Sequence, residues 1–576
     1  MFKALIGILL NELTYSKGIF QSKRINKMKQ NFFTFLALLI LVQASSQTTM
    51  EDISFGEEFI PAKNKRIFYE QILLGSTDKS IFYSNWDRNY IKQYSIYEIS
   101  KNCQLEKEIP VMWKDGKYPI IFKEVINFEN KDLLIAYSHD KRKNSVNLKF
   151  LDLEEGIEEN KLRDFYNFDF NDNTWMIGFS KKNYDSEGFK LSRNKKFLAF
   201  CHSVNLHKKG NKKQFQLAVF DENAQLVFEK LVEIKYKEEQ LFVWDFEVDN
   251  NGQVYILAKE SSDFSNIEQI QVKLGDLFKN TDQAHYSHLY KVTQSEGLQK
   301  MDTNLGAKDF LNGNLFFSQS NELFFVGICN DDKPALFFSK YTSTGETEFH
   351  KSYPLDPETT LPEIIKKRKN KQSKKNKKRK SDNKSKNNKV AFLPYHFTNF
   401  LIDDDEQSFY FVAEYQYKKK RTGKDAPDSF ATDDLLVGKI TFAGEKKWLT
   451  KVQKEFHTQN GMSAYSSYTS NIFGFNAHKE LVFLYNTFKE DQLKGMNKIL
   501  NEKHSKIGFD KTIISSESGE TINTETLFLD EELGNYSMEL NNSFFEEESM
   551  NIYLLFKKIV LFKKPKAKLG SLNISK

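Results

Sequence analysis

A short apolar strand, preceded each time by a polar turn, recurs eight times along the 576 residues of this chain. The copies are apolar on both faces, which is typical of strands covered from both sides. Counted from Ile81 to Ile552, they are separated by 52, 64, 57, 69, 86, 72 and 71 residues. This repetition constrains the fold most, because each unit has to bury its apolar strand against a neighbouring unit. The eight copies are Ser80–Ser84, Asp132–Tyr137, Lys196–Cys201, Gln253–Ala258, Glu322–Gly327, Ser408–Ala413, Glu480–Tyr485 and Asn551–Phe556.

Each copy is framed by two kinds of turn. Polar residues stand before it, and many of them are Asn or Gly, which tolerate the positive φ of tight hairpin turns. An alternating strand follows and ends in a Gly turn, as Val437–Ile440 does before Ala443–Glu445. Each unit is therefore predicted to hold four antiparallel strands. The polar clusters are Ser76–Lys79, Glu129–Lys131, Ser192–Lys195, Asp249–Gly252, Ser318–Asn321, Asp403–Gln407, Asn476–Lys479 and Glu546–Ser549.

Four-stranded units at this spacing predict an all-β fold, a β-propeller of seven or eight four-stranded antiparallel blades over residues 53–574. The stretch Ile53–Ile60 is expected to supply the outer strand of the last blade, so that the ring closes and free sheet edges are removed. The alternative is two β-sandwich domains divided near the basic segment 366–389.

The chain resembles secreted β-propeller proteins in which a polar turn precedes a buried strand and a Gly-Glu turn follows later. The resemblance concerns architecture over residues 53–574 and implies no named subfamily. Trp86-Asp87 follows its buried strand, whereas Trp244-Asp245 precedes its own, so the two pairs are out of register with the Trp-Asp repeat family. The paired glycines of kelch blades are missing as well.

Charge is concentrated in two segments. Residues 366–389 hold 14 Lys and Arg against Asp382, which gives +13, and the leader and signal segment 1–46 contributes +5. The formal net charge of +6 therefore hides a value of −12 for the rest of the chain. A nucleic-acid binder would spread positive charge over a folded face, so no nucleic-acid partner is expected.

The basic segment 366–389 contains no apolar residue, so we expect it to be a disordered insertion in the propeller. One interpretation is a solvated loop with incidental affinity for anions. The other is a selected contact with an anionic surface such as lipid headgroups or acidic glycans. Two cationic clusters would make that contact, Lys366, Lys367, Arg368 and Lys369 in the first and Lys377, Lys378, Arg379 and Lys380 in the second.

Residues 28–46 have the pattern of a secretory signal peptide, with a cationic start, the apolar run Phe32–Val42 and small residues after it. This run is shorter than the roughly 20 residues that span a bilayer. We expect cleavage after Ala44 or Ser46, and a secreted or periplasmic mature chain without a transmembrane span. Residues 1–27 either precede a true start at Met28 or form a long leader.

Two motifs have the residue types of metal sites. Asp403, Asp404 and Asp405 place carboxylates in one turn, which suits Ca²⁺, but the twelve-residue loop with its Gly and distant Glu is missing. His285 and His288 would face opposite sides of a strand. We therefore expect no metal and no cofactor.

Two further histidines and three cysteines carry no site. His139 and His202 follow successive buried strands but have no third ligand. The cysteines lie far apart and form no CxxC pair. Cys201 and Cys329 lie in apolar strands, where we expect small buried side chains rather than a disulfide. The remaining cysteine is Cys103.

No local catalytic motif is present, since the sequence lacks a GxSxG elbow, an HExxH pair and a phosphate-binding glycine loop. Asp169, Asp245 and Glu247 are placed on innermost strands, but no catalytic residue is assigned, because paired carboxylates would come from different blades. The sequence favours an exported, non-catalytic scaffold whose loops hold a protein, peptide or glycan. The alternative is an extracytoplasmic hydrolase or lyase with its site at the propeller channel.

Overall fold

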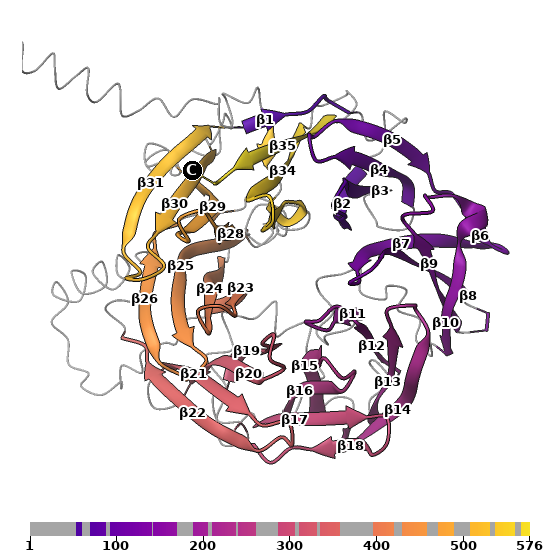
Figure 1. The fold of residues 1–576 in the computed structure, drawn as a ribbon, viewed down its shortest axis with the longest axis horizontal. Helices are drawn as coiled ribbons and strands as arrows, with labels where there is room; N and C mark the ends of the chain where they lie inside the picture. The colour runs from indigo at the N-terminus through magenta and orange to yellow at the C-terminus, as the bar shows by residue number, and fades with distance from the viewer. Residues whose placement is uncertain are drawn as a thin grey trace, which may run out of the picture. The chain divides into compact units, whose positions relative to one another are not determined.

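Eight antiparallel sheets surround a common axis in the computed structural model of the chain (Figure 1). All the residues that the structure describes lie within Asp52–Lys576. They are residues 53–59, 69–87, 93–140, 142–143, 145–169, 188–204, 210–237, 240–260, 286–303, 305, 310–330, 334–356, 395–419, 429–454, 456–457, 471–488, 507–529, 536–538, 540–558 and 566–575.

We number the sheets as blades 1 to 8 in chain order. Each runs from an inner strand beside the axis to an outer strand, and blade 2 has an additional short hairpin strand, β6. Blade 1 consists of β2 (Tyr69–Ser76), β3 (Ser80–Asp87), β4 (Gln93–Ser100) and β5 (Leu105–Pro110). Blade 2 consists of β6 (Lys114–Asp115), β7 (Tyr118–Asn127), β8 (Asp132–Asp140), β9 (Ser145–Asp152) and β10 (Arg163–Asp169), with the 3-10 helix η2 (Glu159–Lys161) before β10. Blade 3 consists of β11 (Gly188–Leu191), β12 (Phe197–Ser203), β13 (Lys212–Asp221) and β14 (Leu226–Lys237). Blade 4 consists of β15 (Leu241–Val248), β16 (Val254–Glu260), β17 (Tyr286–Thr293) and β18 (Gly297–Lys300).

The second half of the ring repeats this plan and ends in a composite blade. Blade 5 consists of β19 (Phe310–Phe317), β20 (Leu323–Asn330), β21 (Pro334–Tyr341) and β22 (Thr347–Pro354). Blade 6 consists of β23 (Tyr395–Asp403), β24 (Ser408–Lys419), β25 (Ser429–Thr441) and β26 (Lys446–Val452), with β27 (Phe456–His457) beside β25. Blade 7 consists of β28 (Asn471–Phe475), β29 (Leu481–Phe488), β30 (Ile507–Ile514) and β31 (Thr521–Leu529). Blade 8 consists of β32 (Ser537–Met538), η6 (Leu540–Asn542), β33 (Phe544–Glu546), β34 (Asn551–Lys558), β35 (Lys566–Asn573) and β1 (Ile53–Phe55).

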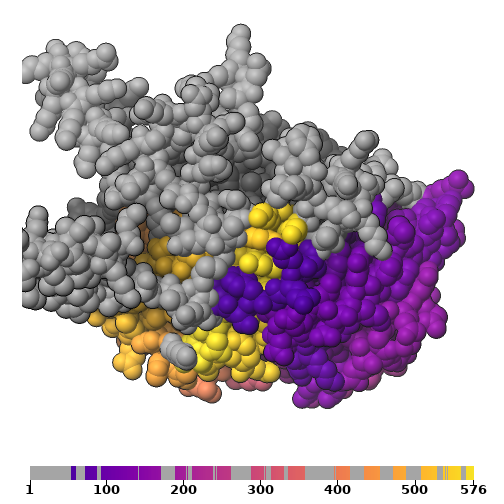
Figure 2. Space-filling model, turned by 90° about the horizontal axis from the view of Figure 1, so that it is seen from above, coloured from indigo at the N-terminus to yellow at the C-terminus, as the bar shows by residue number. Residues whose placement is uncertain are grey.

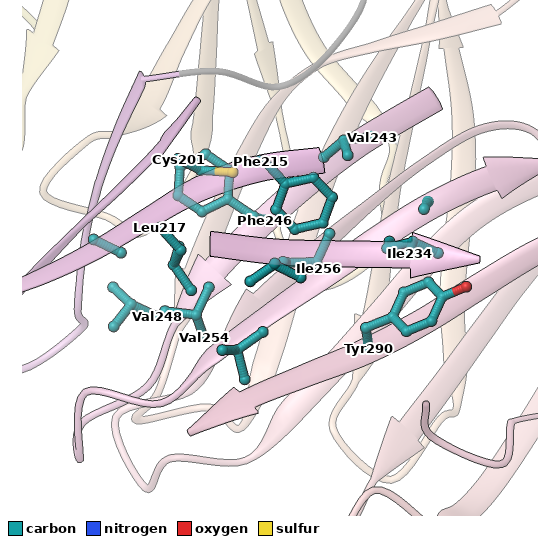
Figure 3. Packing of buried hydrophobic residues seen from close by; sticks show 14 of the residues in the cluster. Cys201, Phe215, Leu217, Ile234, Val243, Phe246, Val248, Val254, Ile256 and Tyr290 are labelled. Carbon is teal, nitrogen blue, oxygen red and sulfur yellow. The ribbon is translucent and has the colours of Figure 1, made fainter. Parts of the chain in front are cut away.

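The eight repeated apolar strands are the second strands of the eight blades, which confirms the predicted unit. They are buried because blades pack face to face, so the hydrophobic core lies between neighbouring blades. One cluster joins Leu217 of blade 3 to Ile256 of blade 4, both with no exposed surface. Figure 3 shows this cluster. Full burial of one such side chain is worth about 1.5–3 kcal/mol, so the blades stabilise one another.

The polar turns form as the sequence predicts. The turn before β16 begins with Asp249, whose carboxylate accepts the backbone N–H groups of Asn251 and Gln253 at 2.9 and 2.8 Å. The turn ends at Gly252 with a φ of +77°, which glycine adopts without steric cost. The equivalent position before β29 is Lys479, with a φ of +55°.

The N-terminal strand closes the ring, as predicted. β1 pairs antiparallel with β35, and Phe59 forms a further bridge to Ala567. Figure 2 shows the two ends of the described chain, indigo and yellow, side by side on one face. The first strand of the ring therefore completes its last blade, and β35 has no free edge along these residues.

The count of blades is eight, so the two-sandwich alternative is wrong. The signal segment 28–46 and the basic segment 366–389 lie outside the described residues. Within the described ranges, no helix has the length and apolarity to cross a membrane.

Candidate functional site

The two sides of the ring differ in how strands are connected. On one side, short turns join first to second strands, as between Ser76 and Ser80, and in blades 1 and 3 to 7 they also join third to fourth strands. On the other side, second strands end and third strands begin, and each blade meets the next; several of these strand ends are far apart in the sequence. β16 ends at Glu260 and β17 begins at Tyr286, while blade 5 ends at Pro354 and blade 6 begins at Tyr395. We call these the turn side and the loop side.

Neighbouring turns on the turn side are joined by hydrogen bonds. The backbone N–H of Asn194 in blade 3 donates to the side chain of Asn250 in blade 4 at 2.9 Å. Asn250 donates its own N–H to Asn321 of blade 5 at 2.7 Å. Gln319 of blade 5 then donates its N–H to Asp404 of blade 6 at 2.7 Å.

An ion pair also joins two turns of this side that belong to non-neighbouring blades. Arg193 of blade 3 donates to the second carboxylate oxygen of Asp404 in blade 6 at 2.9 Å. Blades 4 and 5 lie between these two residues in the ring. The turns of four successive blades are therefore held together by side chains of the polar clusters.

Inner strands are capped by polar side chains from the preceding blade. An inner strand has a partner on one edge only, so the N–H and C=O groups on its other edge need side-chain or solvent partners. Gln93 of blade 1 donates to the carbonyl of Phe122 at 3.0 Å and accepts its N–H at 2.7 Å. Asn542 of blade 8 likewise accepts the N–H of Leu73 in blade 1 at 3.2 Å.

Two more caps follow the same direction around the ring. Asn399 of blade 6 donates to the carbonyl of Asn471 in blade 7 at 3.0 Å. Asp245 of blade 4 accepts the N–H of Leu315 in blade 5 at 3.0 Å. In four pairs of neighbouring blades, a side chain of one blade thus satisfies the backbone of the next.

Asp245 also belongs to a charged cluster with Lys190 and Glu247. Lys190, on β11, places its ammonium 3.2 Å from Asp245 and 2.6 Å from Glu247, both on β15. A bulge between Val243 and Asp245 shifts the register of β15 against β16 just before the acidic pair. The Asp245 side chain is 5% exposed, that of Glu247 18% and that of Lys190 34%, so the two carboxylates are the more buried members of the cluster.

The cluster perturbs the protonation of its members. Burial raises the pKa of Glu247 to about 7; Lys190 lowers it and the charge of Asp245 adds to the rise. Burial lowers the pKa of Lys190, but the two carboxylates raise it by more, so its net shift is upward. A carboxyl group that exchanges a proton near pH 7 beside an ammonium group has the properties of a general acid or base.

Among the predicted site residues, the acidic turn is placed most clearly. Asp403 accepts the N–H of Glu406 at 3.0 Å, and Asp405 is exposed. Asp404 accepts hydrogen bonds from Gln319 and Arg193 of other blades. The described ranges contain no group of three His, Cys, Asp or Glu side chains placed to hold a metal ion. Binding of Ca²⁺ by Asp403–Asp405 therefore stays a hypothesis from the sequence.

The predicted histidines lie in different environments. His202 is buried and packs against Phe168 and Phe200 at ring distances of 5.1 and 6.3 Å. His139 lies near the end of β8 in blade 2. His285 lies outside the described residues, whereas His288 contacts Glu260 and Tyr236.

One strand assignment was wrong. Asp169 is the last residue of β10, which is the outermost strand of blade 2 rather than an innermost one. Cys103, Cys201 and Cys329 are buried and form no disulfide with one another, as expected for Cys201 and Cys329. Lys190 was missed because its partners lie 55 and 57 residues away in another blade. Nothing in its local sequence marks it.

The fold and these caps define the class of the protein, an eight-bladed β-propeller closed by its N-terminal strand. No protein-family model matches the chain, and no curated protein matches its sequence.

Solved structures with a similar fold come from proteins of several kinds. The WD40 domain of SCAP from fission yeast is 7% identical, with 91% of this chain and 99% of that chain covered and a TM-score of 0.36. Polysaccharide lyase Uly1 is 9% identical, with coverage of 88% and 100% and a TM-score of 0.34. Prolyl oligopeptidase B from Galerina marginata is 12% identical with a TM-score of 0.29; 70% of this chain aligns with 44% of that one, less than half its length. These similarities concern the fold alone.

Proposed function

We propose that this chain is an exported, non-catalytic binding scaffold that holds a protein, peptide or glycan at the loop side of its ring. The observation that carries the proposal is the use of polar side chains to cap the inner strands of neighbouring blades. Gln93, Asn399, Asp245 and Asn542 all cap the backbone of the next blade. Groups committed in this way stabilise a rigid frame, and loops positioned by a rigid frame are the usual place for binding residues.

The difference between the two sides supports the choice of the loop side. The turns on the turn side are short and joined to one another, as Asn194 is to Asn250. We therefore propose that contacts with a partner come from the longer stretches of sequence between strands, such as residues 261–285 between β16 and β17.

A specific observation favours one alternative, a hydrolase or lyase with its site at the inner strands. Glu247, with its pKa raised to about 7, lies 2.6 Å from Lys190. A carboxyl group of this kind can move a proton at neutral pH, and the adjacent ammonium can stabilise a developing negative charge.

Binding and activity assays on the secreted chain that begins at Gln47 would distinguish the two functions. This chain is tested for saturable binding to a glycan array and a peptide library, and for product release from polysaccharide, chromogenic glycoside and ester substrates. The scaffold proposal predicts binding that is equal in wild type and Glu247→Gln, without product. Product release that falls at least tenfold in Glu247→Gln would instead establish the enzyme. Export itself is tested by the N-terminal sequence of the secreted chain, which should begin at Ser45 or Gln47.

The basic segment is proposed to contact an anionic surface. In the sequence it falls between Pro354, where blade 5 ends, and Tyr395, where blade 6 begins. Its charge of +13 contrasts with the acidic remainder of the chain, so attraction to lipid headgroups or acidic glycans would be local to this segment and weakened by salt.

A further inference from the structure

Three side chains from two blades place oxygen and nitrogen atoms together at the edge of the interface between blades 3 and 4. Tyr236 lies on the outer strand β14, Glu260 is the last residue of β16, and His288 lies on β17. The Nε2 atom of His288 is 2.9 Å from a carboxylate oxygen of Glu260 and 3.2 Å from the hydroxyl oxygen of Tyr236. The cluster is separate from the inner-strand charges, since β14 is an outer strand.

The strand register explains why the three residues meet. In the antiparallel pair β16–β17, Ala258 stands opposite His288, so Glu260 is its diagonal neighbour. The ring of Tyr236 stacks on the imidazole across the blade interface, at a centroid distance of 5.4 Å and an interplanar angle of 20°. The position of each polar atom is therefore fixed by sheet pairing and ring stacking.

The three polar groups lie within hydrogen-bonding reach of one another, because the Tyr236 hydroxyl also hydrogen-bonds the Glu260 carboxylate. The Nε2 atom carries either one proton or one lone pair, yet two oxygen atoms lie within hydrogen-bond distance of it. A cation would contact all three atoms. Two ligands bound at about 2.1 Å to a tetrahedral or octahedral ion are about 3.0 to 3.4 Å apart, close to the two separations seen here.

We propose that Tyr236, Glu260 and His288 form a binding site for a divalent transition-metal ion, zinc in the first instance. Imidazole and carboxylate are both zinc ligands, and three protein ligands leave a fourth position open for water. The phenol proton of Tyr236 is released to solvent when its oxygen binds the ion, so zinc binding tightens as pH rises.

Charge balance selects a divalent ion. A tyrosinate and a carboxylate together carry −2, which a divalent ion neutralises. Burial is the main cause that lowers the pKa of His288. The nearby charges of Lys300 and Lys235 lower it further. A trivalent ion would leave an uncompensated positive charge beside these two lysines. The exposed fraction of Glu260 is 30% against 9% for His288, so the ion and its water would be reached from the side of the carboxylate.

The test is calorimetric titration of the metal-free, secreted chain with ZnCl₂, together with the visible absorption of a Co²⁺ complex. We expect one equivalent of zinc and cobalt bands of a site with fewer than six ligands. Glu260→Gln, His288→Ala and Tyr236→Phe should each weaken zinc binding at least about tenfold, the lower limit of the loss seen even for residues that only orient metal ligands.

Two matched variants control for folding and for adventitious binding. Tyr290→Phe removes a hydroxyl from the same aromatic cluster, in which Tyr290 lies 6.1 Å from the ring of His288. His478→Ala removes an exposed histidine of the turn side. Both should bind zinc as wild type does. The proposal is overturned if wild type binds no zinc, if the three ligand variants bind it as wild type does, or if His478→Ala removes the bound equivalent. Thermal unfolding of every variant shows whether the ring is intact, and Tyr236→Phe, the least disruptive change, decides the outcome if His288→Ala fails to fold.

Discussion

Replacing Glu247 by Gln is expected to change the pH dependence of stability in one direction. Burial raises the pKa of Glu247 from 4.5 to about 7, although Lys190 is only 2.6 Å away. The folded chain therefore binds this proton more tightly than the unfolded chain between pH 4.5 and 7. Stability that comes from the protonated carboxyl is fully present below pH 4.5 and is lost as pH rises to about 7.

The magnitude follows from the two pKa values. A rise from 4.5 to about 7 corresponds to roughly 3 kcal/mol of unfolding free energy lost across this interval. A neutral Gln of nearly the same shape has no such proton to lose. Glu247→Gln should thus match wild type near pH 4.5 and exceed it by up to roughly 3 kcal/mol at pH 8.

Urea unfolding followed by tryptophan fluorescence, at steps of half a pH unit from 4.5 to 8.5, measures the difference. Glu106→Gln, an exposed glutamate on β5, is the matched control and should give a constant difference at all pH values. If Glu247→Gln is the less stable protein at pH 8, the carboxylate is a net attractive partner of Lys190. In that case the reasoning about burial is refuted.

Three other changes test the ring and its basic segment. Gly474→Ala should destabilise the chain by about 1–3 kcal/mol, because a Cβ there would lie 2.4 Å from the ring of Phe545 in the next blade; an unchanged urea midpoint would contradict the packing of blades 7 and 8. Removing residues 47–59 takes away β1 and exposes the edge of β35, so we expect a lower thermal midpoint and concentration-dependent association on gel filtration; a monomer of unchanged midpoint would show that closure contributes nothing. Deleting 366–389 should abolish salt-sensitive binding to heparin or anionic vesicles while leaving the thermal midpoint in place, and retained binding would exclude the segment as the anionic contact.

The fold was predictable because its signal is local and repeated. Each unit has an apolar segment that must be buried against a neighbouring unit. The representative residues of these segments all lie buried on second strands: Phe82, Leu198, Phe324 and Val482. The polar turns add an independent local signal. Asn321, in the turn before β20, adopts a φ of +65°, the left-handed conformation that Asn tolerates.

The inner and outer strands were less predictable. Both have more polar faces than the second strand and both lie next to irregular segments, so alternation cannot tell one from the other. This is why Asp169 was assigned to an inner strand, whereas β10 is the outermost strand of blade 2. The alternation of Arg163–Asp169 reflects a sheet edge that faces solvent.

The candidate sites depend on pairs of residues that the sequence separates. Lys190 and Glu247 meet because β11 and β15 are neighbouring inner strands, and Tyr236 and His288 meet because an outer strand packs on the next blade. Such pairs depend on blade order and strand register together. A single sequence gives the first but leaves the second open wherever a bulge occurs, as it does just before Asp245.

The direction of the inner-strand caps explains why Lys190 stands out. Gln93, Asn399 and Asn542 reach forward to backbone groups of the next blade, where an unsatisfied N–H or C=O would be costly. Lys190 also reaches forward, but to the side chains of Asp245 and Glu247. Asp245 in turn caps Leu315 in blade 5, so it needs no lysine for that purpose. The capping of blade 5 accounts for Asp245 but leaves the pairing of Lys190 with Glu247 unexplained. Lys190 and Glu247 are therefore the inner-strand pair at which substitution tests the enzymatic alternative most directly.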